Sequence, residues 1–146
     1  IPLDGVYSMN QERYDRELAL TALDPAQIVM IHKRRNLYMP MIENALDDAN
    51  LPEDLQYIPV IESALRNVAL STAGAAGIWQ FMPDTARRYG LVVDDFVDER
   101  LDPVKSTEAA VRYLRDLYTD FNEDVFLTAA AYNRGENGLQ RDLARQ

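Results

Sequence analysis

The sequence has 146 residues, the size of one domain, and 47% of them are apolar, which is enough to bury a continuous core. It holds 24 acidic against 15 basic side chains, so its formal net charge is −9. This balance argues against a nucleic-acid or anionic-lipid surface, where Lys and Arg must neutralise phosphates, but it does not exclude binding of a sugar polymer. Cysteine is absent, which excludes disulfides, thiolate metal sites and Cys nucleophiles.

The single histidine, His32, lies in a run of basic residues with no nucleophile motif near it, so we interpret it as a cation on a helix surface. No apolar stretch approaches the roughly 20 residues of a membrane span. The chain begins at Ile1 with neither Met nor a signal peptide, which indicates a processed or recombinant fragment. No metal and no cofactor are predicted.

The N-terminal part, residues 1–27, is mixed and polar and is predicted to form an arm or short helix on the main domain, residues 28–146. That domain opens with helical spacing over Ile28 to Asn50, which Pro40 is expected to interrupt. The next predicted helix, Asp54 to Glu62, is apolar on nearly every side and is therefore expected to be buried.

A loop of small residues, Ser71 to Gly77, separates this part from the remaining helices. Helix signals follow in the rest of the chain, and strand alternation does not, so the fold class is predicted to be all-α. The predicted elements are a helix from Pro83 to Gly90, an acidic connector over residues 94–100, a long helix beginning at Asp102-Pro103 with Ala110, Leu114, Leu117 and Phe121 on one stripe, a turn at Asn122-Glu123-Asp124, a buried helix from Val125 to Asn133 ended by Gly135, and a short helix from Leu139 to Gln146.

Glu62 is the main candidate for chemistry because it ends an apolar helix. A carboxyl group there loses hydration, which favours the neutral acid needed to protonate the leaving oxygen of a glycosidic bond. A structural glutamate paired with Arg66 or Arg100 is an equally open interpretation.

Two other pairs of residues lie where they could meet a ligand. Trp79 and Gln80 follow the small-residue loop, where an indole could stack on a sugar and an amide could bond to it, or where Trp79 could simply be a core residue. Tyr132 and Asn133 end a helix, where they could face a cleft or cap the helix.

The acidic residues of the connector do not have the spacing of a calcium-binding loop, and a solvated segment with one helix cap is the favoured interpretation. These residues are Asp94, Asp95, Asp98, Glu99 and Asp102.

The ordered motifs Glu62-Ser63, Gly77-Ile78-Trp79-Gln80 and Ala131-Tyr132-Asn133 together resemble the catalytic domain of soluble and membrane-bound lytic transglycosylases. Four segments resemble the D-type membrane-bound members: Leu51 to Leu55, Gly77 to Ala86, Tyr89 to Leu91 and Asp98 to Pro103.

This resemblance implies a lysozyme-like, goose-type α fold. It implies cleavage of the β-1,4 bond between N-acetylmuramic acid and N-acetylglucosamine in peptidoglycan, leaving 1,6-anhydromuramyl ends. It also implies a bacterial periplasmic or envelope location, with outer-membrane association through a segment outside this chain. Glu62 would be the acid that becomes the base, and Ser63, Trp79, Gln80, Tyr132 and Asn133 would bind the substrate. The hydroxyl group of Tyr132 is expected within hydrogen-bonding reach of Glu62, directly or through one water.

Family members usually continue past the Tyr-Asn motif. Three explanations stay open: a C-terminal truncation, a disordered stretch missing from the sequence, or a naturally reduced variant of the enzyme, with a partner chain as one way to complete the cleft. Two other functions stay open. One is a hydrolytic lysozyme that admits water, and the other is a catalytically weak module that binds glycan strands or helps to assemble an envelope machine.

Overall fold

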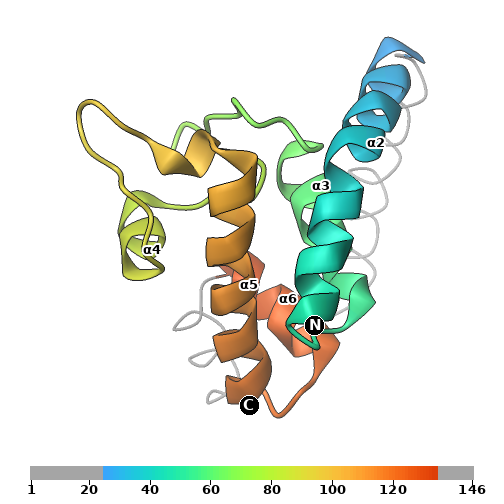
Figure 1. The fold of residues 1–146 in the computed structure, drawn as a ribbon, viewed down its shortest axis with the longest axis vertical. Coiled ribbons are helices and arrows are strands. Elements are labelled where there is room, and N and C mark those ends of the chain that lie inside the picture. The colour runs from blue at the N-terminus through green and yellow to red at the C-terminus, as the bar shows by residue number, and fades with distance from the viewer. Residues whose placement is uncertain (1–24, 135–146) are drawn as a thin grey trace, which may run out of the picture.

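The computed structural model describes residues 25–134, and these are mostly helical (Figure 1). Within the described residues, strand pairing is limited to three isolated bridges, so the all-α prediction is confirmed. The predicted N-terminal arm up to residue 24, the helix stop at Gly135 and the short C-terminal helix lie outside the described residues. The elements are α2 (Pro25–Asp48), η1 (Glu53–Tyr57), α3 (Ile58–Ser63), α4 (Pro83–Arg88), η2 (Glu99–Leu101), α5 (Pro103–Asp120) and α6 (Val125–Arg134).

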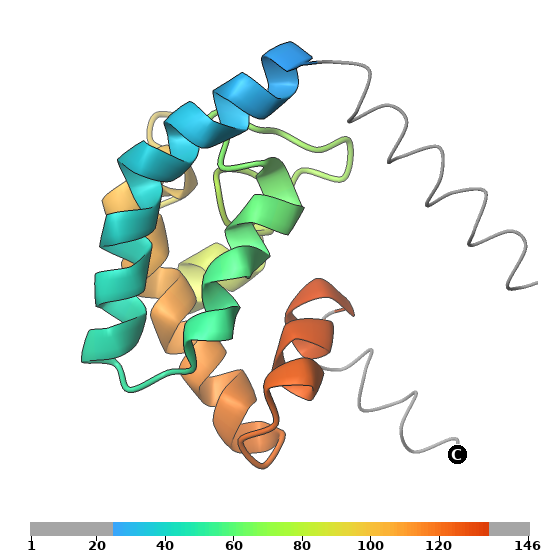
Figure 2. The same cartoon turned by 90° about the vertical axis from the view of Figure 1, so that its right-hand side faces the viewer.

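The long helix α2 does not stop at Pro40, contrary to prediction. Proline removes one backbone hydrogen bond in a helix interior, but the helix can continue by bending away from its ring. Pro40 is exposed, and α2 curves along its length (Figure 2). The helix also crosses the predicted boundary between residues 27 and 28, and His32 lies exposed on it, as predicted.

Helix α5 is the element around which the core forms, and α2, α6 and η2 all pack against it. Its start follows the predicted pattern: the Asp102 side chain accepts hydrogen bonds from the backbone N–H groups of Val104 and Lys105, and Pro103 occupies the first turn. The predicted stripe is also confirmed, since Ala110, Leu114, Leu117 and Phe121 are all buried.

The predicted helix over residues 54–62 is in fact two shorter elements, η1 and α3, which meet at Ile58. Pro59 lies in the first turn of α3, where its missing N–H costs nothing. The expectation of burial on every side was wrong, because Ile61 is 78% exposed and Tyr57 is 47% exposed. Helix α3 ends one residue after Glu62, at a cap formed by Ala64 in the left-handed conformation.

Helix α6 follows the predicted turn, in which Asn122 and Glu123 both have positive φ angles. It is less buried than predicted: Thr128 and Ala131 are inside, but Phe126 is 87% exposed. None of the helices within residues 25–134 is both long enough and apolar enough to span a membrane.

The acidic connector is more ordered than the sequence indicated. Asp94 accepts hydrogen bonds from the backbone of Phe96 and Val97, while Glu99 accepts one from Val92 and pairs with Lys105. Within the described part of the chain, no group of three or more His, Asp or Glu side chains is arranged to hold a metal ion. These acids therefore fold the connector, and Asp102 is the helix cap that was predicted.

Candidate active site

A cleft of about 420 Å³ lies where α3, α6 and the loop between α3 and α4 come together. Its volume is within the range of small-molecule binding sites. Four of the residues predicted from sequence line it, although they come from three separate segments. The lining residues are Glu62, Ser71, Ala75, Gln80, Phe81, Met82, Thr85, Tyr113, Tyr132, Asn133 and Arg134.

Glu62 is partly buried at the C-terminal end of α3. Burial raises the pKa of its carboxyl group above the ordinary value, and a hydrogen bond from the side chain of Asn133 lowers it by less. That bond joins Asn133 Nδ2 to Glu62 Oε1 over 3.4 Å, which is long for a hydrogen bond. The partial negative charge at a helix C-terminus also disfavours the carboxylate. The site therefore favours the protonated acid.

The alternative in which Glu62 is a structural partner of an arginine is not what the structure shows. Arg100 pairs with Asp98, and the Nε atom of Arg66 donates to the backbone carbonyl of Ser63. Glu62 is consequently a desolvated carboxyl whose described hydrogen-bond partner is a neutral amide.

Tyr132 lies beside Glu62 but is bonded elsewhere. Its hydroxyl group donates to the backbone carbonyl of Trp79 at 2.7 Å and not to Glu62, so the direct form of the predicted hydrogen bond is not made, while a link through one water stays a prediction. Burial and the nearby Glu62 carboxylate raise the pKa of Tyr132, and it stays a neutral phenol. The bond to Trp79 fixes α6 against the loop that carries Gln80.

Gln80 lies at the cleft in a left-handed backbone conformation, with φ of 51°. Its Nε2 atom donates to the backbone carbonyls of Gly77 at 2.8 Å and Ala69 at 3.3 Å. Because the amide nitrogen is held inside the loop, the amide oxygen is the atom that Gln80 can offer to a ligand as an acceptor.

Two predicted substrate contacts lie behind the cleft instead of in it. Ser63 is 5% exposed, and its hydroxyl group donates to the backbone carbonyl of Ile78 at 2.8 Å. Trp79 has no exposed surface, and its indole N–H donates to the hydroxyl oxygen of Thr107 at 2.9 Å. Neither side chain is exposed to the cleft. The burial of Trp79 fits the alternative in which it is a core residue, and the sugar contacts of Trp79 and Ser63 stay predictions.

Several lining residues were missed from the sequence. Ser71 and Met82 flank predicted motifs, and Thr85 follows the first residues of α4, so their place along the chain was the available signal. Tyr113 sits on the core stripe of α5, since it is three residues after Ala110 and four before Leu117. Its ring centroid lies 5.2 Å from that of Tyr132, and both tyrosines line the cleft. The apolar stripe of α5 therefore extends from the core to the wall of the cleft.

A larger hollow, of about 610 Å³, lies between α2 and α5. Its carboxyl groups, Asp48 and Glu108, are exposed, and none of its lining residues comes from the loop or from α6. We therefore assign the chemistry to the smaller cleft, which holds the desolvated acid.

These features define a small helical domain with one desolvated carboxyl group in a polar cleft. The model of the transglycosylase SLT domain family matches residues 39–146, and the chain belongs to this family.

Two curated relatives are much longer than the segment that aligns with this chain. It is 42% identical over 110 residues to membrane-bound lytic murein transglycosylase D of Escherichia coli K12, an alignment that covers 75% of this chain and 24% of that protein. It is 35% identical over 104 residues to peptidoglycan transglycosylase gp16 of Escherichia phage T7, covering 70% of this chain and 8% of gp16. The chain thus spans about a quarter of the length of the first relative.

A solved structure confirms the fold. The X-ray structure of an inactive mutant of lytic transglycosylase Slt from Pseudomonas aeruginosa superimposes with a TM-score of 0.59 and 24% identity. The alignment covers 69% of this chain and 17% of that one. The lysozyme-like helical fold expected from the motifs is therefore the fold of this domain.

Proposed function

We propose that this domain is a lytic transglycosylase that cleaves the β-1,4 bond between N-acetylmuramic acid and N-acetylglucosamine in peptidoglycan. The observation that carries the proposal is the raised pKa of Glu62 inside a cleft shared with Gln80, Tyr132 and Asn133. Membership of the SLT domain family and the names of both curated relatives support the same substrate and reaction.

Glu62 acts first as an acid. Its proton passes to the bridging O4 atom of the leaving N-acetylglucosamine as the C1–O4 bond breaks, and the 2-acetamido group of the muramyl residue assists departure. The carboxylate of Glu62 then takes the proton from the muramyl 6-hydroxyl group, whose oxygen attacks C1. The new O6–C1 bond closes the 1,6-anhydro ring, and Glu62 is again protonated.

This one-acid mechanism agrees with the composition of the cleft. The described lining residues hold no second carboxyl group besides Glu62, whereas ordinary two-carboxylate glycosidases need one at a set distance. Intramolecular attack gives the 6-hydroxyl group a large effective concentration over water.

The neighbouring side chains have distinct proposed roles. Asn133 stabilises the carboxylate after the proton has left, because its amide donates to Oε1 of Glu62. Gln80 accepts a hydrogen bond from a sugar hydroxyl or acetamido N–H through its oxygen. Tyr132 holds α6 to the loop through Trp79. Because peptidoglycan lies in the cell envelope, we propose that the domain acts in the bacterial periplasm or cell envelope.

Digestion of purified sacculi, followed by mass spectrometry of the products, tests the proposal. Wild-type protein should release anhydromuropeptides as the main products. Glu62→Gln should lower the rate by about 10²–10⁴-fold or more, because general acid catalysis is lost. The matched control is Glu43→Gln, since Glu43 is an exposed carboxyl group on α2 outside the cleft.

Each other outcome contradicts a defined part of the proposal. Products that end in reducing muramic acid, heavier by one water, would make the enzyme a hydrolase. Binding of glycan strands without cleavage would make it a binding module. Wild-type turnover by a folded Glu62→Gln variant would remove Glu62 from the mechanism.

A further inference from the structure

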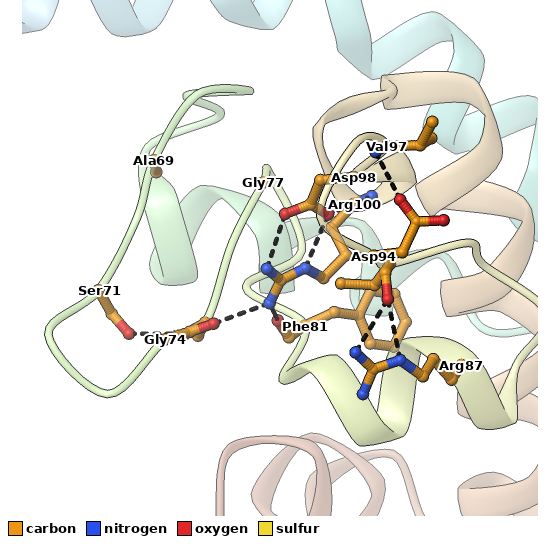
Figure 3. Close-up of polar contacts among 12 residues, drawn as sticks. Ala69, Ser71, Gly74, Gly77, Phe81, Arg87, Asp94, Val97, Asp98 and Arg100 are labelled. Carbon is orange, nitrogen blue, oxygen red and sulfur yellow. Dashed lines mark hydrogen bonds and ion pairs between the residues drawn. The ribbon is translucent and has the colours of Figure 1, made fainter.

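Arg100 is a buried arginine at the junction between η2 and the loop that carries Gln80. It is 6% exposed, and its guanidinium group makes a two-pronged contact with Asp98, with Nε to Oδ1 at 2.8 Å and Nη2 to Oδ2 at 2.7 Å (Figure 3). The same group reaches across to the loop, where Nη1 donates to the backbone carbonyls of Gly74 at 2.7 Å and Phe81 at 2.9 Å (Figure 3).

The two carbonyls that Arg100 binds lie on either side of the segment that carries Gln80. Phe81 is also paired with Ala76 through two backbone hydrogen bonds, which close the turn between them. Gly77, inside that turn, approaches the backbone of Arg100 so closely that a Cβ there would lie 1.9 Å from the Arg100 carbonyl oxygen. Arg100 therefore contacts the turn with both its side chain and its backbone.

A guanidinium group suits this task better than an apolar side chain. Burying a charge costs free energy unless it is paired and bonded, and Asp98 supplies the pair. The hydrogen bond from Arg100 lowers the pKa of Asp98, which keeps that carboxylate ionised. The planar fork fixes Arg100 on Asp98 while its remaining nitrogen aims at two carbonyls, which a lysine cannot reproduce.

We infer that Arg100, oriented by Asp98, is a positioning residue that holds the loop over residues 71–81 so that Gln80 and Ser71 face Glu62 across the cleft. Gln80 needs such support because its left-handed φ of 51° is unfavourable for a residue with a side chain. This inference rests on the proposed function for its effect on catalysis but not for its effect on the loop.

The test compares Arg100→Met, Arg100→Lys and Asp98→Asn with a control, Arg112→Met. Arg112 is exposed on α5, and its guanidinium group donates to the Tyr89 carbonyl, so the control removes a similar bond away from the cleft. Two readouts are taken on each variant. One is amide hydrogen exchange at Gly77 and Phe81 against Leu114 in α5, and the other is kcat and KM on sacculi.

Arg100→Met should speed exchange at Gly77 and Phe81 at least about 10-fold while Leu114 stays protected, and should raise KM about 10-fold or more with a smaller change in kcat. Arg100→Lys should recover part of both effects, and Asp98→Asn should resemble a weaker Arg100→Met. The descending limb of the pH profile should stay in place, because the amide that bonds to Glu62 belongs to Asn133 on α6 and not to the loop. Arg112→Met should change none of these.

Two results would overturn the inference. One is uniform acceleration of exchange in the loop and α5 with unchanged KM, which is the pattern of a purely structural residue. The other is wild-type loop exchange in a folded Arg100 variant. If Arg100→Met does not fold, Arg100→Lys decides by the same readouts. If the wild-type protein cleaves no peptidoglycan, the proposed function fails, while the exchange data still decide whether Arg100 holds the loop.

Discussion

Two opposing effects set the pKa of the Glu62 carboxyl group. Loss of hydration favours the neutral acid, and the Asn133 amide favours the carboxylate. The first effect is the larger one, in part because the bond from Asn133 is long at 3.4 Å and therefore weak. Asn133 is thus the residue whose hydrogen bond lowers the pKa of Glu62. It follows Tyr132, which holds α6 to the loop through the Trp79 carbonyl.

Substituting Asn133 should move the pH profile of catalysis in a defined direction. A general acid works while protonated, so kcat/KM falls as the pH rises through the pKa of Glu62. Asn133→Ala removes a donor that favours the carboxylate, so the pKa of Glu62 rises and the descending limb should move to higher pH. Asn133→Asp adds a like charge and should move it further.

The pH profiles of kcat/KM for both variants and wild type check this prediction. Asn44→Ala, an exposed change on α2, serves as the control and should leave the limb in place. A limb that moves to lower pH in Asn133→Ala would show that the amide acts on Glu62 in the opposite sense.

The sequence identified the segments around Glu62 better than it identified the direction of their side chains. Glu62 could be singled out because the end of an apolar helix desolvates a carboxyl group, although a structural role stayed equally open until the family motifs were considered. Ser63 and Trp79 come from equally specific motifs, yet both side chains turn inward to buried partners, Ile78 and Thr107. Nothing local distinguishes a polar group that binds a ligand from one that joins two segments.

At the scale of elements, side chains from three other segments donate hydrogen bonds to backbone carbonyls of the loop over residues 71–81. Ser63 of α3 bonds to the Ile78 carbonyl, Tyr132 of α6 bonds to the Trp79 carbonyl, and Arg100 after the connector bonds to the Phe81 carbonyl. A loop of small residues has little preference of its own, so these contacts decide its shape.

Gly77 should be the least replaceable glycine of this loop. Gly77→Ala places a Cβ 1.9 Å from the Arg100 carbonyl oxygen at a φ of +80°, so backbone must move, and we expect a loss of about 2–4 kcal/mol in the free energy of unfolding. Gly74→Ala is the matched control. It has a φ of +91° with nothing within 4 Å, so only the left-handed penalty of about 1–2 kcal/mol applies.

Urea unfolding of the two variants and wild type measures both losses. Equal losses would mean that the close approach to Arg100 relaxes at no cost.

Sequence patterns predicted a helix well where its capping residues and its apolar stripe indicate the same bounds. They predicted it less well where the bounds were inferred from a single residue. Asp102 and Pro103 start α5 as predicted, because capping is a local interaction. Pro40 did not end α2, since a curved helix on the surface tolerates the lost bond. The exposure of Phe126 could not be foreseen, because it depends on which elements lie opposite it.

For the whole molecule, the cleft is a product of tertiary packing. Glu62 and Asn133 are 71 positions apart in the chain, and they meet because α3 and α6 both lie against the same loop. The family motifs indicated that these residues belong together, but packing around α5 decides which atoms meet. Desolvation of Glu62 is likewise a property of the assembled fold, since the unfolded chain leaves the carboxyl group in water.

The raised pKa of Glu62 should therefore appear in the pH dependence of stability. Between the ordinary glutamate pKa, about 4.3, and the raised folded value, the folded state binds more protons than the unfolded state. The free energy of unfolding then falls as the pH rises through this window, and above it the folded protein carries a constant penalty. Glu62→Gln removes the penalty, so the variant should melt higher than wild type near pH 7, by a small amount because Glu62 is only partly buried. The difference should vanish as the pH is lowered to about 4. Glu43→Gln, an exposed change on α2, serves as the control. Thermal melts of the three proteins across this range check the sign. A Glu62→Gln variant that is less stable than wild type near neutral pH would mean that the fold favours the carboxylate, and the acid role assigned to Glu62 would lose its physical basis.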